Sequence, residues 1–316
     1  MCLGILSTCK QVLYISYAST PMPTAQLVNL FILSILWGGS FLFIGVAVQE
    51  LAPLLLVFLR VAIAAMAMLI VLKLVRVKLP NTLMEWRNYA VMGLINNVIP
   101  FTLIFYAQTH ISVSLASIIN AMTPVCTFIV LALFGEELLK PNKILGSLMG
   151  LAGVAILSGL LQLSLDVSLI GVLMSFGATV SYGFSGLWAK RHLAGRNSIQ
   201  SATCQMISST GLMLILMPLL GVSLPSDLPS KEVIWAVLTL ALASTALAYI
   251  LFFELISKAG TSNAMLVTLL VPVSGSVLGH LVMGDQLHLI QLVGALMIGL
   301  GLLIIDGRIF KRKIAN

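Results

Sequence analysis

Four polar side chains interrupt two otherwise apolar segments of the chain. Asn96 and Asn97 lie within residues 88–135, a run without Asp, Glu, Lys or Arg, and Ser244 and Thr245 follow 148 positions later in another charge-free run. Polar groups are costly in hydrocarbon and usually face the interior of a helix bundle. Amides and hydroxyls at that depth can hold a small solute by hydrogen bonding. The ordinary alternative is hydrogen bonding between neighbouring helices.

Two aromatic residues are related in the same way, at an offset of 145. Trp37 and Tyr182 each precede a glycine and stand three positions before a serine, Ser40 and Ser185 respectively. A ring beside a small residue borders a recess, and its face can hold an apolar or cationic group of a solute. Such a ring also serves simply in helix packing or at the membrane interface.

Pro124 and Pro272 are expected in the middle of helices. A proline there removes a backbone donor and frees the carbonyl one turn earlier, which belongs to Asn120 or to Thr268. The freed carbonyls can bind a solute or let the helix bend during gating, whereas the ordinary alternative is a fixed kink. Asn120 also places its side chain at this level and is therefore a candidate cavity residue.

Charged residues are rare in the apolar segments. Arg60 is the only formal cation predicted within one. Its side chain can reach toward the membrane surface, pair with Glu50, or meet a carboxylate of the solute. Glu254 stands four residues before Lys258, a spacing that favours an ion pair on one helix face.

His280 precedes Asp285 near the end of another apolar segment, so the two side chains form a candidate proton relay. A solvated histidine at the interface is the ordinary alternative. The four cysteines show no CxxC and no Cys/His metal spacing, and we expect no metal, cofactor or catalytic group. The candidate solute-binding residues are Trp37, Ser40, Asn96, Asn97, Asn120, Tyr182, Ser244, Thr245 and Tyr249; those for gating are Pro124 and Pro272; those for ion pairing or coupling are Arg60, Glu254 and His280.

The composition predicts what positions these residues. Of 316 residues, 59% are hydrophobic and 9% charged, against about 25% charged in soluble proteins. A helix needs about 20 apolar residues to cross a bilayer, and helices satisfy their own backbone there. We expect an all-α integral membrane protein with ten transmembrane helices, at 27–48, 53–72, 89–107, 113–134, 144–161, 169–189, 199–220, 233–253, 263–283 and 288–306.

The chain repeats itself. Pro124 lies 148 positions before Pro272, and the same offset relates three glycines to three others: Gly146, Gly153 and Gly159 to Gly294, Gly301 and Gly307. The repeats predicted are residues 27–161 and 169–309, with an N-terminal segment 1–26 and a basic tail 310–316. Each repeat contains five spans, an odd number, so the second repeat crosses the membrane in the opposite direction to the first. Such inverted repeats are typical of secondary transporters.

The basic residues predict the orientation. With both termini in the cytoplasm, fifteen of the seventeen Lys and Arg lie inside, while Lys231 lies outside and Arg60 within a span. The net charge of +7 therefore follows from topology, and nucleic-acid binding is not needed to explain it. Whether translation starts at Met1 or Met22 stays open.

Several motifs resemble the EamA repeat of the drug/metabolite transporter superfamily. They are residues 36–41 (LWGGSF), Arg60 after Phe-Leu, and Thr-Pro-Val at 123–125 followed by Gly-Glu, which returns as Val-Pro-Val at 271–273 followed by Gly-Asp. The resemblance covers about residues 27–309 and implies a ten-helix carrier that moves small metabolites, often amino acids, outward. Copy two departs from it with Gln205 in place of an arginine and Asp285 in place of the usual glutamate.

The expected function is therefore an inner-membrane secondary transporter, an exporter working by alternating access. Its partners are the lipid bilayer and a small neutral or zwitterionic solute such as an amino acid, because the spans hold almost no charge to compensate another. A coupling proton and the oligomeric state stay open. The alternatives are a nucleotide-sugar or phosphate-ester carrier, an integral-membrane lipid-modifying enzyme, and a channel or scaffold.

Overall fold

The computed structural model describes residues 22–138, 140–157, 168–222, 227–278 and 289–306, and every regular element in these ranges is a helix. The first half contains α2 (Thr24–Ala47), α3 (Pro53–Leu74), α4 (Leu83–Gly93), η1 (Leu94–Val98), α5 (Ile99–Ala107), α6 (Val113–Asn120), α7 (Thr123–Leu133) and α8 (Pro141–Leu157). The second contains α9 (Leu169–His192), α10 (Ser198–Leu219), α11 (Lys231–Ala241), η3 (Leu242–Leu247), α12 (Ala248–Ala259), α13 (Thr261–Ala264), α14 (Val267–Leu278) and α15 (Leu289–Asp306).

The chain is a multi-pass membrane protein. Seven described helices are long and apolar enough to cross a bilayer: Thr24–Ala47, Pro53–Leu74, Leu83–Ala107, Leu115–Leu133, Leu169–His192, Ser198–Leu219 and Lys231–Ala259. The other three predicted spans fall on α8, α13–α14 and α15, which adjoin residues outside the described ranges. The count of ten therefore stays a prediction.

The helices repeat at the offsets seen in the sequence. α2 and α9 each have 24 residues and α3 and α10 each have 22, with both pairs offset by 145. α4 and α11 each have 11 residues and are offset by 148. Both halves thus contain the same series of helices.

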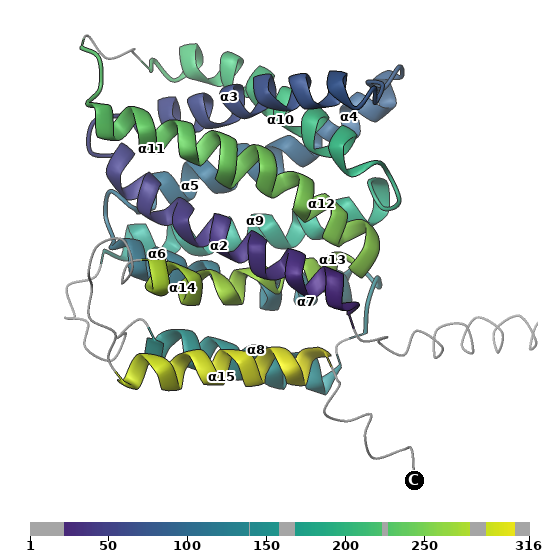
Figure 1. Cartoon of the computed structure of the whole chain (residues 1–316), viewed down its shortest axis with the longest axis vertical. Helices are drawn as coiled ribbons and strands as arrows, with labels where there is room; N and C mark the ends of the chain where they lie inside the picture. Colours follow the sequence, from purple (N-terminus) through teal and green to yellow (C-terminus); the bar gives the residue numbers. More distant parts are fainter. Residues whose placement is uncertain (1–21, 139, 158–167, 223–226, 279–288, 307–316) are drawn as a thin grey trace, which may run out of the picture.

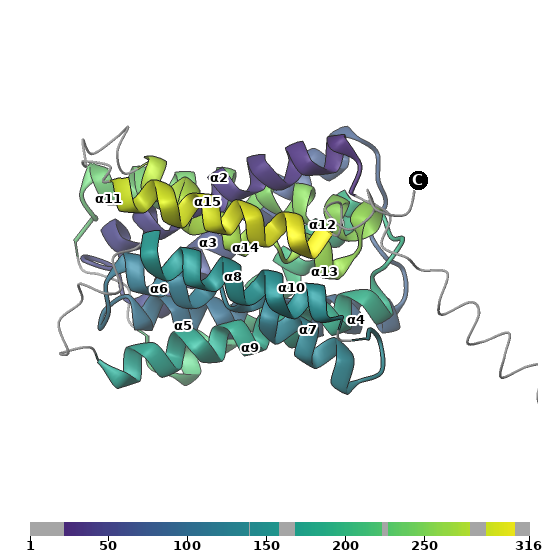
Figure 2. The same ribbon diagram turned by 90° about the horizontal axis from the view of Figure 1, so that it is seen from below.

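Two pairs of equivalent helices, α3 with α10 and α8 with α15, lie at opposite ends of the bundle (Figure 1). All the helices run side by side, with α3 and α10 near one end of the long axis and α8 and α15 at the other (Figures 1 and 2). A Cβ added to Gly146 would lie 2.5 Å from the Gly301 carbonyl oxygen, and one on Gly153 would lie 2.6 Å from that of Gly294. Residue numbers increase along α8 while those of the contacting residues decrease along α15, so these two helices are antiparallel.

Both halves contain a π-helical segment at the same place. η1 interrupts the long helix formed by α4 and α5, and η3 interrupts the one formed by α11 and α12, again at an offset of 148. π-helical turns are rare and frequently mark functional sites. In η3, the Thr245 hydroxyl donates to the carbonyl of Leu240, five residues earlier, at 2.7 Å. Such a side-chain bond competes with the regular backbone pattern.

The two prolines differ in their surroundings. The chain turns at residues 121–122, and Pro124 is the second residue of α7, where its missing N–H has no helical partner to lose. The prediction that Pro124 lies inside a continuous helix is therefore wrong in detail. Pro272 lies inside α14, as predicted. In copy two the chain turns earlier, between α13 and α14.

Candidate functional site

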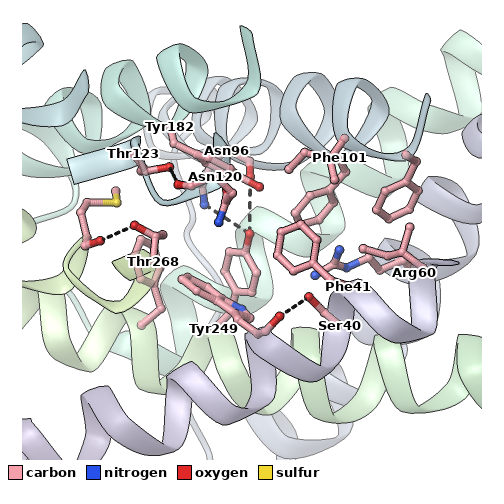
Figure 3. A pocket seen from close by; sticks show the side chains of 16 residues that line it. Ser40, Phe41, Arg60, Asn96, Phe101, Asn120, Thr123, Tyr182, Tyr249 and Thr268 are labelled. Atoms are coloured by element: carbon pink, nitrogen blue, oxygen red, sulfur yellow. Dashed lines mark hydrogen bonds between the residues drawn. The ribbon is translucent and has the colours of Figure 1, made fainter. Parts of the chain in front are cut away.

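A cavity with about 560 Å³ of empty volume, which includes space open to solvent, lies between the two halves of the bundle (Figure 3). The first half contributes residues of α2, α3, η1, α5, α6 and α7, and the second contributes residues of α9, α12 and α14 and the turn before α14. The lining residues are Trp37, Ser40, Phe41, Ile44, Arg60, Asn96, Phe101, Ile104, Phe105, Asn120, Thr123, Tyr182, Tyr249, Phe252, Met265 and Thr268.

Asn96 reaches the cavity from η1. Its amide oxygen accepts a hydrogen bond from the Ser185 hydroxyl of α9 at 2.8 Å, and its amide nitrogen donates to the Tyr249 hydroxyl of α12 at 3.4 Å. The long second bond is weak. The amide of Asn96 is therefore held in place by the second half of the chain and keeps a donor group near the cavity.

Asn97, the next residue, does not line the cavity. Its amide oxygen accepts from the Tyr249 hydroxyl at 2.7 Å and from the Gln205 amide at 2.8 Å, and its amide nitrogen donates to the Ser209 hydroxyl at 2.9 Å. These bonds tie η1 to α10 and α12, and the residue is fully buried. The structure therefore places Asn97 in the interhelical bonding that was its ordinary alternative.

Aromatic rings form much of the cavity wall. The Trp37 ring lies 6.1 Å from the Tyr249 ring and 5.4 Å from the Phe252 ring, between centroids. Tyr182 lines the wall from α9, and Ser40 lines it one turn after Trp37, whose carbonyl accepts the Ser40 hydroxyl at 2.6 Å. Thus Trp37 and its predicted symmetry mate Tyr182 both contribute to one cavity.

Ser244 and Thr245 lie behind the wall. Arg60 Nε donates to the Thr245 hydroxyl oxygen at 2.8 Å, and Arg60 Nη2 donates to the Ser244 carbonyl at 3.4 Å. Neither η3 residue lines the cavity, and the Thr245 hydroxyl bonds Arg60 and the carbonyl of Leu240 in its own helix. Both residues are buried, and their link to the cavity runs through Arg60.

Arg60 itself enters the cavity from α3 and is 3% exposed. Its guanidinium carbon lies 3.8 Å from the centroid of the Phe101 ring, and Figure 3 shows the guanidinium directed into the pocket. Stacking of this kind stabilises a buried cation. The pairing with Glu50 does not form, because the Glu50 carboxylate accepts bonds from the Ser230 amide at 2.7 Å and hydroxyl at 2.6 Å.

The remaining candidates are spread over the molecule. Asn120 lines the cavity, and its carbonyl accepts the Thr123 hydroxyl at 2.7 Å, while Pro124 and Pro272 are not among the lining residues. Glu254 accepts from Lys258 at 2.6 Å, the ion pair that their spacing predicts, and lies away from the lining. His280 and its proposed partner Asp285 lie outside the described residues.

The sequence reasoning missed most of the apolar lining. Ile44, Phe101, Phe105, Phe252 and Met265 are ordinary members of apolar segments, and nothing in their type separates them from lipid-facing neighbours. Helical spacing offered a partial signal. Phe252 lies three residues after Tyr249, on the same face of α12. In the described part of the chain, no three His, Cys, Asp or Glu side chains gather in a group that could hold a metal.

Known proteins are similar over nearly the whole chain. The uncharacterized transporter YoaV of Bacillus subtilis (strain 168) is 22% identical, with 89% of this chain and 96% of YoaV covered. A probable amino-acid metabolite efflux pump of Salmonella typhimurium is 27% identical, with 85% and 91% covered, and the uncharacterized inner membrane transporter YedA of Escherichia coli (strain K12) is 26% identical, with 83% and 84% covered.

A solved crystal structure has the same fold. It superposes with a TM-score of 0.72 at 18% sequence identity, covering 93% of this chain and all of that one. The EamA-like transporter family matches twice, over residues 25–159 and 169–306. Together, the two matches cover most of the sequence and confirm the resemblance found in the motifs. The chain therefore belongs to the EamA-like transporter family.

Proposed function

We propose that the protein is a secondary transporter that exports a small zwitterionic or neutral metabolite, such as an amino acid, across the inner membrane by alternating access. One observation carries the proposal: a cavity inside the bundle is lined by both halves of the chain. Secondary transporters with repeated halves bind their solutes at such an interface, near the middle of the bilayer.

The proposal includes ten transmembrane helices arranged as two inverted repeats. The antiparallel packing of α8 on α15 supports the inversion, because Gly146 meets Gly301 while their mates Gly294 and Gly153 meet each other. A twofold axis produces such reciprocal contacts. A second reciprocal pair agrees with it: Arg60 of α3 binds η3, and Gln205, 145 positions later in α10, binds η1.

Alternating access requires elements that can bend on both sides of the bound solute. The segments η1 and η3 carry Asn96 and the partners of Arg60. Their irregular backbone makes them the hinges in this proposal, with α4 and α11 moving relative to α5 and α12. Both termini are placed in the cytoplasm, in agreement with the distribution of Lys and Arg.

The solute class is supported by the lining and by one relative. The described wall is aromatic and apolar with a few neutral polar groups and a single cation, Arg60. A phosphate-ester carrier would be expected to present several cations to its solute. The probable amino-acid metabolite efflux pump of Salmonella typhimurium is similar over 85% of this chain, which favours an amino acid or a related compound.

A transport screen tests this function. Inside-out vesicles containing the protein would be offered radiolabelled amino acids and related metabolites, with and without an imposed proton gradient, and compared with vesicles lacking it. We expect saturable uptake of at least one solute, and a gradient-dependent rate if a proton is coupled. Absence of uptake for every solute under both conditions would contradict the proposal.

The orientation has its own test. A periplasm-active reporter fused after Asp227 should be active, and one fused after Arg196 should be inactive, because the predicted loops lie on opposite sides. A reporter that is active only in the cytoplasm should give the reverse pattern. The reverse pattern would contradict the proposed orientation, and equal location of the two fusion points would contradict a crossing of the membrane by α10.

A further inference from the structure

The charge of Arg60 has no acidic partner among the described residues around the cavity. None of the lining side chains is a carboxylate, and the described ion pairs of the protein involve other residues. Glu50, the nearest acidic candidate from sequence, is occupied by Ser230. An arginine stays protonated inside proteins. The cavity wall therefore carries one formal positive charge from the described residues.

The hydrogen bonds of Arg60 leave part of the guanidinium free for another molecule. Nε donates to the Thr245 hydroxyl and Nη2 to the Ser244 carbonyl, both neutral acceptors. Neither bond involves Nη1, and among the described residues none accepts from it. A guanidinium presents paired N–H groups that match the two oxygens of a carboxylate.

The other half of the chain shows that holding the π-segment needs no charge. Gln205 stands 145 positions after Arg60, on α10, and its side-chain nitrogen donates to Asn97 of η1 at 2.8 Å. Arg60 makes the equivalent bond to Thr245 of η3. A glutamine thus suffices to join α10 to η1. The equivalent bond between α3 and η3 therefore does not explain why residue 60 is a charged arginine.

A buried charge without a counterion is expensive in a membrane. The ring of Phe101 and the neutral oxygens reduce that cost, but a carboxylate held against the guanidinium would remove far more of it. The rest of the lining is mainly aromatic and aliphatic. Such a wall suits the apolar body of a solute whose acidic end meets Arg60.

We propose that Arg60 binds a carboxylate of the transported solute, and that the cargo is a small monocarboxylate with an apolar or aromatic body. This proposal rests on the transport function above, names the group of the solute that the site binds, and admits net anionic monocarboxylates beside zwitterionic amino acids. The carboxylate is the required group. An ammonium group is not required, because the described lining contains no acidic side chain to bind it. A hydrophobic amino acid and its deaminated analogue therefore both satisfy the site.

Matched pairs of acids and amides test the proposal. Proteoliposomes containing the full chain would be given 3-phenylpropionate or 3-phenylpropanamide, 4-methylpentanoate or 4-methylpentanamide, and phenylalanine or phenylalaninamide. Rates in protein-free liposomes are subtracted to remove passive entry. We expect each acid to be transported at least about ten-fold faster than its amide at low concentration, since burying an unpaired charge costs more than 1.4 kcal/mol.

Arg60→Gln is the decisive variant, because Gln205 already fills the equivalent place in copy two. It should fold, as judged by monodisperse elution and an unfolding temperature near that of wild type, and lose the advantage of acids over amides. Lys73→Gln makes the same charge change on the exposed face of α3 and should keep the advantage.

The outcomes separate the two proposals. Equal transport of acids and amides by the wild type, or an unchanged preference in Arg60→Gln, would overturn the carboxylate site and leave the transport function standing. Failure of the wild type to transport either member of every pair, together with a negative metabolite screen, would overturn both.

Discussion

Asn96 and Asn97 are neighbours in the chain, yet their side chains have different surroundings. Asn96 lines the cavity, whereas Asn97 is fully buried among Gln205, Ser209 and Tyr249. Their spacing and polarity were readable from the sequence. Which of them faces the cavity depends on the π-turn of η1, and a regular 3.6-residue period does not describe that turn.

The two amides should respond differently to substitution. Asn97→Ala removes three interhelical hydrogen bonds at about 0.6 kcal/mol each, so we expect a loss of about 2 kcal/mol in unfolding free energy. Asn96→Ala should change stability less and raise the KM for the solute. Unfolding in detergent and uptake in vesicles measure the two effects. A stable Asn97→Ala protein with impaired affinity would contradict this division.

At the scale of helices, the internal repeat was the most reliable signal in the sequence. It gave equal offsets for helices and for π-segments, because a duplicated sequence repeats its local preferences. The proline pattern was less reliable. Pro124 and Pro272 are symmetry mates in the sequence, but one begins a helix and the other lies inside one. The turns of the two copies lie at different positions, and tertiary packing determines where each turn falls.

Close contact between α8 and α15 gives a prediction at this scale. A Cβ on Gly301 would lie 2.5 Å from the Gly146 carbonyl oxygen, whereas a Cβ on Gly299 would meet nothing within 4 Å. Gly301→Ala should therefore separate the two helices and cost about 1–3 kcal/mol, while Gly299→Ala should be neutral or slightly stabilising. Thermal unfolding of the purified variants measures both. Equal unfolding temperatures would contradict the packing described for this pair.

At the scale of the whole molecule, composition and apolar run length were enough to predict an all-helical membrane protein. The order of the motifs along the chain indicated the family, and the two matches to the family model, over residues 25–159 and 169–306, confirm it. The lining of the cavity was predictable only where a residue differs chemically from its surroundings, as with Asn96, Asn120, Trp37 and Arg60. Its aliphatic and phenylalanine members depend on how helices from both halves rotate against each other, which a single sequence does not fix.

Transport through this cavity is the central claim, and two tryptophans test it most directly. Trp37 forms part of the cavity wall, whereas Trp235 is 69% exposed on the outer surface of α11. In inside-out vesicles, uptake of a solute identified by the screen would be compared for wild type, Trp37→Ala and Trp235→Ala at matched protein levels. We predict that Trp37→Ala lowers kcat/KM by at least about five-fold, since an aromatic contact contributes about 1 kcal/mol beyond its buried area, and that Trp235→Ala transports like wild type. Wild-type kinetics in Trp37→Ala would contradict the claim.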